Sequence, residues 1–173
     1  MKQPNKVGGG ANTNVNGLWF EQTTSLEDVL KSIPNISIID DKVFKSNNEI
    51  GLLCGKGGLY SKLLKPRGID SSTIISKKLL PDEAFYNYQN KKLYIIEKKF
   101  QNSSGSVDEK LQTCHFKKRQ YTKLMDTLKI KIEYIYVLND WFRRPEYKDV
   151  HEYINEVGCQ YYFNQIPIHI IGL

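Results

Sequence analysis

The sequence has few cysteines and no long apolar run. It contains only Cys54, Cys114 and Cys159, widely spaced and without a Cys-x-x-Cys pair. This pattern argues against a disulfide framework and a cysteine-rich zinc site, so we expect free thiols. No apolar stretch reaches the roughly 18 residues of a membrane span, and the first residues lack the apolar core of a signal peptide. We therefore expect a cytoplasmic protein with no membrane partner.

The length leaves no room for two ordinary domains. A chain of 173 residues with 40% hydrophobic and 25% charged residues is typical of one globular domain with a packed core. Residues 1–17 are rich in Gly and Asn and have little to bury, which indicates a flexible N-terminal segment. We expect a single domain over residues 18–173.

One segment of the chain has far fewer acidic than basic residues. From Lys91 to Lys123 the chain has nine basic and three acidic residues, which accounts for the whole formal net charge of +6. Concentrated positive charge is typical of proteins that bind a polyanion such as nucleic acid. The alternative is a solvated lysine face with no partner.

The hydrophobic pattern predicts an α/β fold with a mixed central sheet and flanking helices. Helical spacing covers residues 18–33, 107–128 and 147–157, with a break in the first helix near Ser25. Strand-like runs cover residues 36–45, 73–76, 79–86, 93–100, 130–138 and 166–171. Residues 51–70, rich in Gly, Lys and Ser, are expected to be mostly loop.

The strongest local pattern is a β-hairpin over residues 79–100. Two apolar stretches flank a polar segment, and a turn centred between Gln89 and Asn90 places Asp82 opposite Glu97. Opposed residues have Cβ atoms about 4.5 to 5.5 Å apart. Both carboxylates could therefore reach one Mg²⁺, a cation that prefers oxygen ligands.

Strand alternation adds a lysine to this pair of acids. It places Lys99 on the same face as Glu97 and turns Lys98 away. Two carboxylates that hold a hard cation, with an ammonium near its water, suit phosphodiester hydrolysis. The alternative is that these are ordinary surface charges on a hairpin.

At these positions the chain resembles the PD-(D/E)XK nuclease superfamily. Pro81-Asp82 and Glu97-x-Lys99 match its motif, and the order of predicted elements is similar. The superfamily is the fold of most type II restriction endonucleases and of several junction-resolving and recombination nucleases. Residues 8–14 also look like the start of some restriction endonucleases. The resemblance thus implies a restriction endonuclease-like core.

The resemblance also implies roles for individual residues. Asp82 and Glu97 would bind Mg²⁺, and Lys99 would assist the attacking water. Glu21 fits the position of an additional acid on the first helix, and Gln101 fits a polar position two residues after the lysine.

The hypothesis from sequence is a Mg²⁺-dependent endonuclease of restriction type that cuts duplex DNA as a homodimer, because two strands of a symmetric site need two active sites. The alternatives are a junction-resolving or repair nuclease that reads DNA shape, and a non-catalytic DNA-binding module. The residues expected to contact DNA are Lys98, Ser104, Ser106, Gln112, Lys117 and Arg119.

Overall fold

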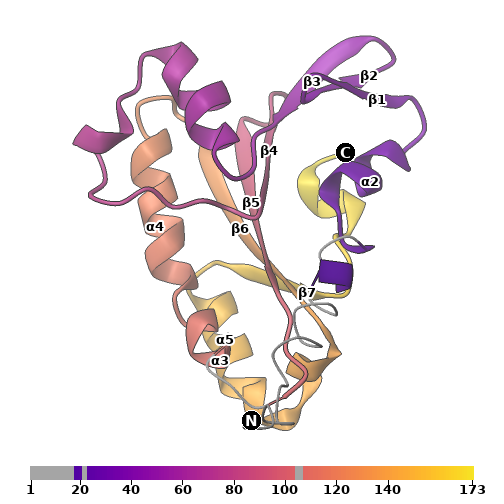
Figure 1. The fold of residues 1–173 in the computed structure, drawn as a ribbon, viewed down its shortest axis with the longest axis vertical. Helices are drawn as coiled ribbons and strands as arrows, with labels where there is room; N and C mark the ends of the chain where they lie inside the picture. The colour runs from indigo at the N-terminus through magenta and orange to yellow at the C-terminus, as the bar shows by residue number, and fades with distance from the viewer. Residues whose placement is uncertain (1–17, 21–22, 104–106) are drawn as a thin grey trace, which may run out of the picture.

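A mixed β-sheet forms the centre of the protein, for which the computed structural model describes residues 18–20, 23–103 and 107–173. Seven strands lie in the order β1-β2-β3-β4-β5-β6-β7 (Figure 1). Their bounds are β1 Ile36–Ile39, β2 Lys42–Lys45, β3 Asn48–Leu53, β4 Glu83–Asn87, β5 Lys92–Lys99, β6 Lys131–Leu138 and β7 Gln160–Phe163. The predicted α/β class with a mixed central sheet is confirmed.

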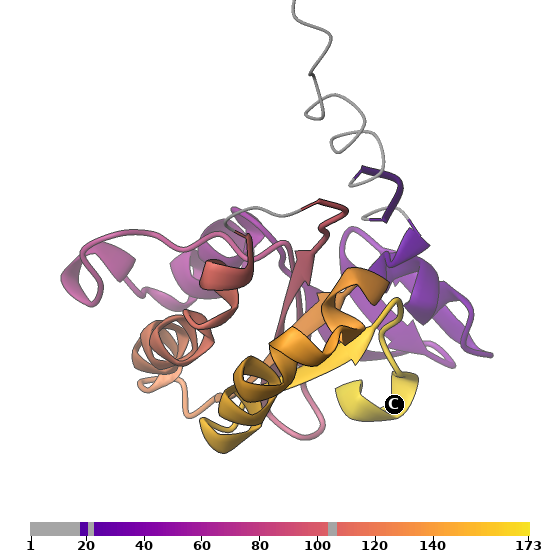
Figure 2. The same ribbon diagram turned by 90° about the horizontal axis from the view of Figure 1, so that it is seen from below.

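The helices lie on both faces of this sheet. They are α2 Leu26–Lys31, α3 Val107–Leu111, α4 Cys114–Met125 and α5 Lys148–Glu156. Figure 2, seen from below, separates the indigo α2 on one side from the salmon α4 on the other. Shorter helices are the π-helix Leu59–Leu64 and the 3-10 helices Lys65–Arg67, Ser71–Thr73, Asp140–Arg143, Pro145–Tyr147 and Ile168–Ile171. Within the described ranges, no helix has the length and apolar character that crossing a membrane would require.

The strand directions bring three chain segments to one edge. Strands β1 to β5 are successively antiparallel, whereas β5, β6 and β7 are parallel. Parallel neighbours need a crossover, supplied here by α3 and α4 and then by α5. The carboxyl ends of β5, β6 and β7 therefore meet, with Lys99 beside Leu138 and Leu138 beside Phe163.

Period-two alternation divides the core into two layers. On β5, Leu93 and Ile95 pack into the layer under α4, whereas Tyr94 and Ile96 face the layer under α2. Both faces of the central strands are thus covered, which explains the near-continuous apolar runs in their sequences.

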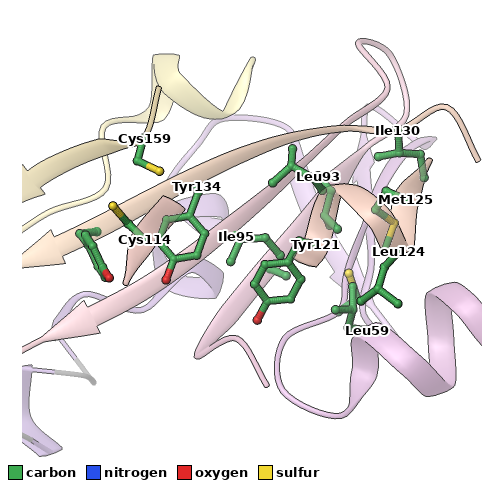
Figure 3. Close-up of a cluster of buried hydrophobic side chains, with 14 of the residues drawn as sticks. Leu59, Leu93, Ile95, Cys114, Tyr121, Leu124, Met125, Ile130, Tyr134 and Cys159 are labelled. Atoms are coloured by element: carbon green, nitrogen blue, oxygen red, sulfur yellow. The ribbon is translucent and has the colours of Figure 1, made fainter. Parts of the chain in front are cut away.

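The core layer under α4 also contains all three cysteines. In Figure 3, Cys114 of α4 and Cys159, just before β7, point their sulfur atoms toward each other beside Tyr134. Cys54, Cys114 and Cys159 are all buried free thiols, which confirms the expectation from their number and spacing.

The predicted helix over residues 107–128 is interrupted. A turn at residues 112–113 separates α3 from α4, and Thr113 donates both its N–H and its hydroxyl to the Lys110 carbonyl oxygen, at 3.2 and 2.7 Å. A threonine that bonds to nearby main chain competes with continued helix. The apolar stripe is nevertheless confirmed, because Leu111, Cys114 and Tyr121 are fully buried.

Three predictions outside this helix are wrong. Residues 73–76 form no strand, because Asp70 accepts the Ser72 N–H and begins a 3-10 helix instead. The last strand is β7, and the segment after Pro167 turns into a 3-10 helix that buries Ile171. Residues 51–70 hold the end of β3 and the π-helix. Gly51 lies in β3, where a Cβ would be 2.4 Å from the Phe85 ring. This position therefore requires glycine because the strand packs closely, not because the chain forms a loop there.

Candidate active site

The hairpin of β4 and β5 has the predicted register. Glu83 pairs with Ile96 and Ala84 with Ile95, so the next residue outward, Asp82, lies opposite Glu97. The Asp82 carboxylate accepts the main-chain N–H of Lys98 at 2.8 Å. This hydrogen bond holds Asp82 at the end of β5 although it precedes β4 in sequence.

Glu97 is a nearly buried carboxylate with two ammonium partners. Its exposed fraction is 4%, and its Oε2 accepts from Lys99 Nζ and from Lys117 Nζ, each at 3.0 Å. Lys99 Nζ also donates to the Lys98 carbonyl oxygen at 3.1 Å and lies 3.9 Å from Asp82 Oδ2. One ammonium therefore lies among three oxygen atoms from three different residues.

Lys117 binds Glu97 in this site, a contact that the sequence analysis did not predict. Sequence reasoning assigned it to DNA contact, whereas its ion pair with Glu97 joins α4 to β5. The signal was present in the helical spacing, because Lys117 lies three residues after buried Cys114 and four before buried Tyr121. A lysine on the packed face of a helix needs a partner there.

The opposite face of β5 carries a second ion pair. Lys98 Nζ lies 3.2 Å from Glu83 Oε2, and the Lys98 side chain is only 5% exposed. Glu83 also accepts the Leu26 N–H at 3.0 and 3.1 Å, which joins the hairpin to the start of α2. Burial raises the pKa of Glu83, and Lys98 opposes that shift. The predicted alternation is confirmed, and the burial of Lys98 argues against its expected contact with DNA.

Gln101 is held by a residue that follows β6. Its N–H donates to Asn139 Oδ1 at 3.1 Å, and Asn139 Nδ2 donates to its carbonyl oxygen at 2.8 Å. Gln101 is buried, with 4% of its surface exposed. Asn139 thus fixes the chain just beyond Lys99, a positioning contact that required knowledge of the parallel pairing of β5 with β6.

Three of the expected site residues, Glu21, Ser104 and Ser106, lie outside the described residues. Gln112, in the turn between α3 and α4, and Arg119, on α4, are exposed. Their expected contacts with DNA stay predictions.

Ion pairs reduce the excess positive charge of the basic segment. Lys91 precedes β5 and Lys99 is its last residue, so about 26 Å of extended chain separates them. Four lysines of the segment pair with acids, since Lys92 binds Glu133, Lys98 binds Glu83, and Lys99 and Lys117 bind Glu97. Two of these pairs use acids from outside the segment, Glu133 and Glu83, and so reduce its excess charge, while its role in binding a polyanion stays a prediction.

Two clefts share Asp82. One, of about 390 Å³, extends past Asp41 and Lys62, and the other, of about 350 Å³, extends past Ser25 and Asp28. Asp82, Glu83 and Lys56 line both clefts. A larger cleft of about 620 Å³ lies around Tyr60 and the π-helix and has none of the predicted site residues on its walls. The walls of the two smaller clefts include Asp82 but neither Glu97 nor Lys99, so Asp82 is the residue that connects the Glu97 cluster with these clefts.

The donor set fits a hard cation. The oxygens of Asp82, Glu97 and the Lys98 carbonyl converge on the Lys99 ammonium. Mg²⁺ typically takes one or two carboxylates and keeps several waters. In the described part of the chain no group of three or more His, Cys, Asp or Glu side chains could hold a metal ion, and Glu21, the third expected acid, is outside that part.

Comparisons of the chain with family models, curated proteins and solved structures found no match.

Proposed function

We propose that this protein is a metal-dependent DNA endonuclease with a restriction endonuclease-like core. The observation that carries the proposal is the position of the Lys99 ammonium, 3.0 Å from Glu97, 3.1 Å from the Lys98 carbonyl and 3.9 Å from Asp82. Oxygens that already surround one cation are suited to bind another, and one of these residues, Asp82, lines two clefts. The resemblance of these residues to the PD-(D/E)XK motif supports the same function.

Mg²⁺ bound by Asp82 and Glu97 would acidify a water molecule and withdraw charge from the phosphate. The Lys99 ammonium would then orient the attacking water and stabilise charge that develops on the phosphate oxygens.

Lys117 allows Lys99 to turn toward substrate. Both lysines hold the same oxygen of Glu97. If Lys99 leaves that oxygen, the buried carboxylate keeps one charged partner, so the movement does not leave an unpaired charge in a nearly dry environment. We assign Lys117 as a positioning residue on this ground.

We further propose that the enzyme is of type II restriction type and acts as a homodimer. The Gly- and Asn-rich start, which resembles that of some restriction endonucleases, supports the first point. The need for two active sites on a symmetric duplex supports the second.

Plasmid digestion tests the proposal. Supercoiled DNA is incubated with the protein and Mg²⁺, with EDTA as one control and the Glu97→Gln variant as another, and the products are separated on a gel. We expect discrete fragments with the wild-type protein and none in the controls. Fragments that persist with Glu97→Gln would come from a contaminating nuclease and would contradict the assignment.

Branched and linear substrates separate the alternatives. Cleavage confined to four-way junctions or flaps would indicate a junction-resolving or repair nuclease. Mg²⁺-independent binding with no cleavage of any substrate would indicate a non-catalytic DNA-binding module and would overturn the proposed activity.

A further inference from the structure

Lys56 lies beside the candidate active site without belonging to its motif. It is exposed and lines both clefts that share Asp82. It follows Gly55 in the connection between β3 and the π-helix, a region that sequence reasoning treated as loop. Its ammonium can therefore reach the space in front of Asp82 from the side opposite α4.

Lys56 also differs from the neighbouring lysines in its partners. Lys62 pairs with Asp41, Lys98 with Glu83 and Lys99 with Glu97. Lys56 forms no ion pair with any residue of the described ranges. The walls of the two clefts also carry the carboxylates of Asp82 and Glu83, and the exposed Lys56 ammonium, which forms no ion pair with them, is available to an anion.

The main chain holds Lys56 in a left-handed conformation. Its φ is 52°, a region that residues other than glycine, asparagine and aspartate adopt at a cost. Its N–H donates to the Pro81 carbonyl oxygen at 2.7 Å, and the Cys54 N–H donates to Ala84 at 2.8 Å. A Cβ at Gly55 would lie 2.9 Å from the Glu83 Cα, so the loop packs tightly on the start of β4, next to Asp82.

These observations combine a main chain held by hydrogen bonds, a strained residue and an ammonium that forms no ion pair within the described residues. Glycine would fit the same φ without strain, and no ion pair within the described residues offsets the cost of lysine. Strained residues at clefts occur where the side chain contributes to function. Lys91 and Lys129 have the same left-handed conformation, so what distinguishes Lys56 is its place on the wall of both clefts beside Asp82.

We infer that Lys56 binds a phosphodiester oxygen of the DNA backbone next to the phosphate that is cleaved. The inference rests on the proposed nuclease function and adds a substrate contact on the Asp82 side of the site. A lysine acts as a point charge on a flexible stem, which suits phosphate contact without base recognition.

Salt-dependent binding tests this contact. A fluorescein-labelled duplex of mixed sequence is titrated with protein at several salt concentrations in the absence of divalent metal, so that no cleavage occurs. For Lys56→Gly we expect the slope of log K against log salt to fall by about 0.9, the loss of one phosphate contact. The melting temperature should rise by about 2 to 4 °C, because the left-handed strain is relieved.

Lys129→Gly is the matched control. Lys129 is also exposed and has a φ of 55°, but it lies between α4 and β6, at the opposite end of the parallel strands from Lys99. The same rise in melting temperature with an unchanged salt slope is expected. Lys56→Arg should keep the wild-type slope, because the charge remains.

The outcomes separate this inference from the proposed function. If the wild-type protein cleaves DNA and Lys56→Gly keeps both the slope and the cleavage rate, the phosphate contact is wrong and the nuclease assignment stands. If the wild-type protein cleaves no DNA, the proposed function and this inference are both overturned. A lower slope together with roughly tenfold slower cleavage, in a variant that melts no lower than wild type, supports the contact.

Discussion

The two faces of β5 carry similar charges in different surroundings. On one face Glu97 binds two ammonium groups, from Lys99 and Lys117, and Asp82 lies 3.9 Å from the first of them. On the other face Glu83 binds one ammonium, from Lys98, and both of its oxygens also accept a main-chain N–H of α2.

The difference indicates what each face does. The Glu83 pair is satisfied by fixed partners on two elements and has little freedom to move. The Glu97 cluster has more ammonium groups than its one carboxylate oxygen requires, and one of those groups lies among three oxygens. A carboxylate oxygen that binds two ammonium groups, one of them next to Asp82, is suited to a ligand, whereas a satisfied pair is suited to holding α2 on the sheet. Alternation along one strand separates the two roles.

The largest expected effect is on the Asp82 and Glu97 face. Asp82→Asn and Glu97→Gln should each reduce DNA cleavage by at least about 100-fold, because each removes a charged oxygen from the proposed metal site. Cleavage rate is measured on plasmid DNA in Mg²⁺, with a thermal melt to show that the variants are folded. A folded variant with near-normal cleavage would contradict the metal site.

The next prediction contrasts two neighbouring lysines, one expected to affect cleavage and the other stability. Lys99→Met should slow cleavage by about 100-fold, because the group that orients water is lost. Lys98→Met should leave cleavage within a few-fold of wild type but lower the free energy of unfolding by about 2 kcal/mol, since Glu83 loses its charged partner.

Urea unfolding and cleavage assays on the same preparations measure both quantities. The comparison breaks down if Lys98→Met is the catalytically damaged variant, because that result would place the catalytic lysine on the α2 face of β5.

A smaller effect is expected at Lys117. Lys117→Met should slow cleavage by roughly tenfold through the orientation of Glu97, the scale seen for residues that position a metal ligand. Lys117→Arg should restore much of the rate, because a guanidinium can reach the same oxygen.

The salt dependence of DNA binding distinguishes this role from a phosphate contact. An unchanged slope in Lys117→Met supports positioning, whereas a slope lower by about 0.9 would return Lys117 to the DNA-contact role expected from sequence.

Local periodicity predicted the hairpin and its register well. The polar segment 87–92 predicted a turn, which the structure places between the paired residues Asn87 and Lys92, and alternation placed Glu97 and Lys99 on one face, as the structure confirms. The buried β6 and the apolar stripe of α4 were equally visible, because burial on one or both faces leaves a direct trace in the sequence.

Contacts between distant elements could not be predicted in the same way. Lys117 reaches Glu97 across 20 residues, and Asn139 reaches Gln101 across 38. These contacts depend on the parallel pairing of β5 with β6 and on the crossover through α4, which periodicity does not specify. For the same reason a count of charges along the chain could not show that Lys92 and Lys98 pair with acids outside the basic segment.

The smallest expected effect is the pH dependence of the Glu83 face. Burial raises the pKa of Glu83 in the folded protein, despite opposition from Lys98 and the Leu26 N–H. A carboxyl group with a raised folded pKa binds protons more readily in the native state than in the unfolded chain. Its contribution to stability is therefore fully present below the unfolded pKa of about 4.3 and is lost as the pH rises through the folded pKa.

Glu83→Gln keeps an oxygen for the Leu26 N–H and cannot titrate. As the pH is raised from about 4 to 7, wild type should therefore lose melting temperature relative to Glu83→Gln. In the Lys98→Met background the same trend should be steeper, since the charge that favours ionised Glu83 is gone. Melting curves of the four proteins across this range measure both slopes, and a wild type that gains stability relative to Glu83→Gln would mean that the ion pair with Lys98 outweighs burial on this face.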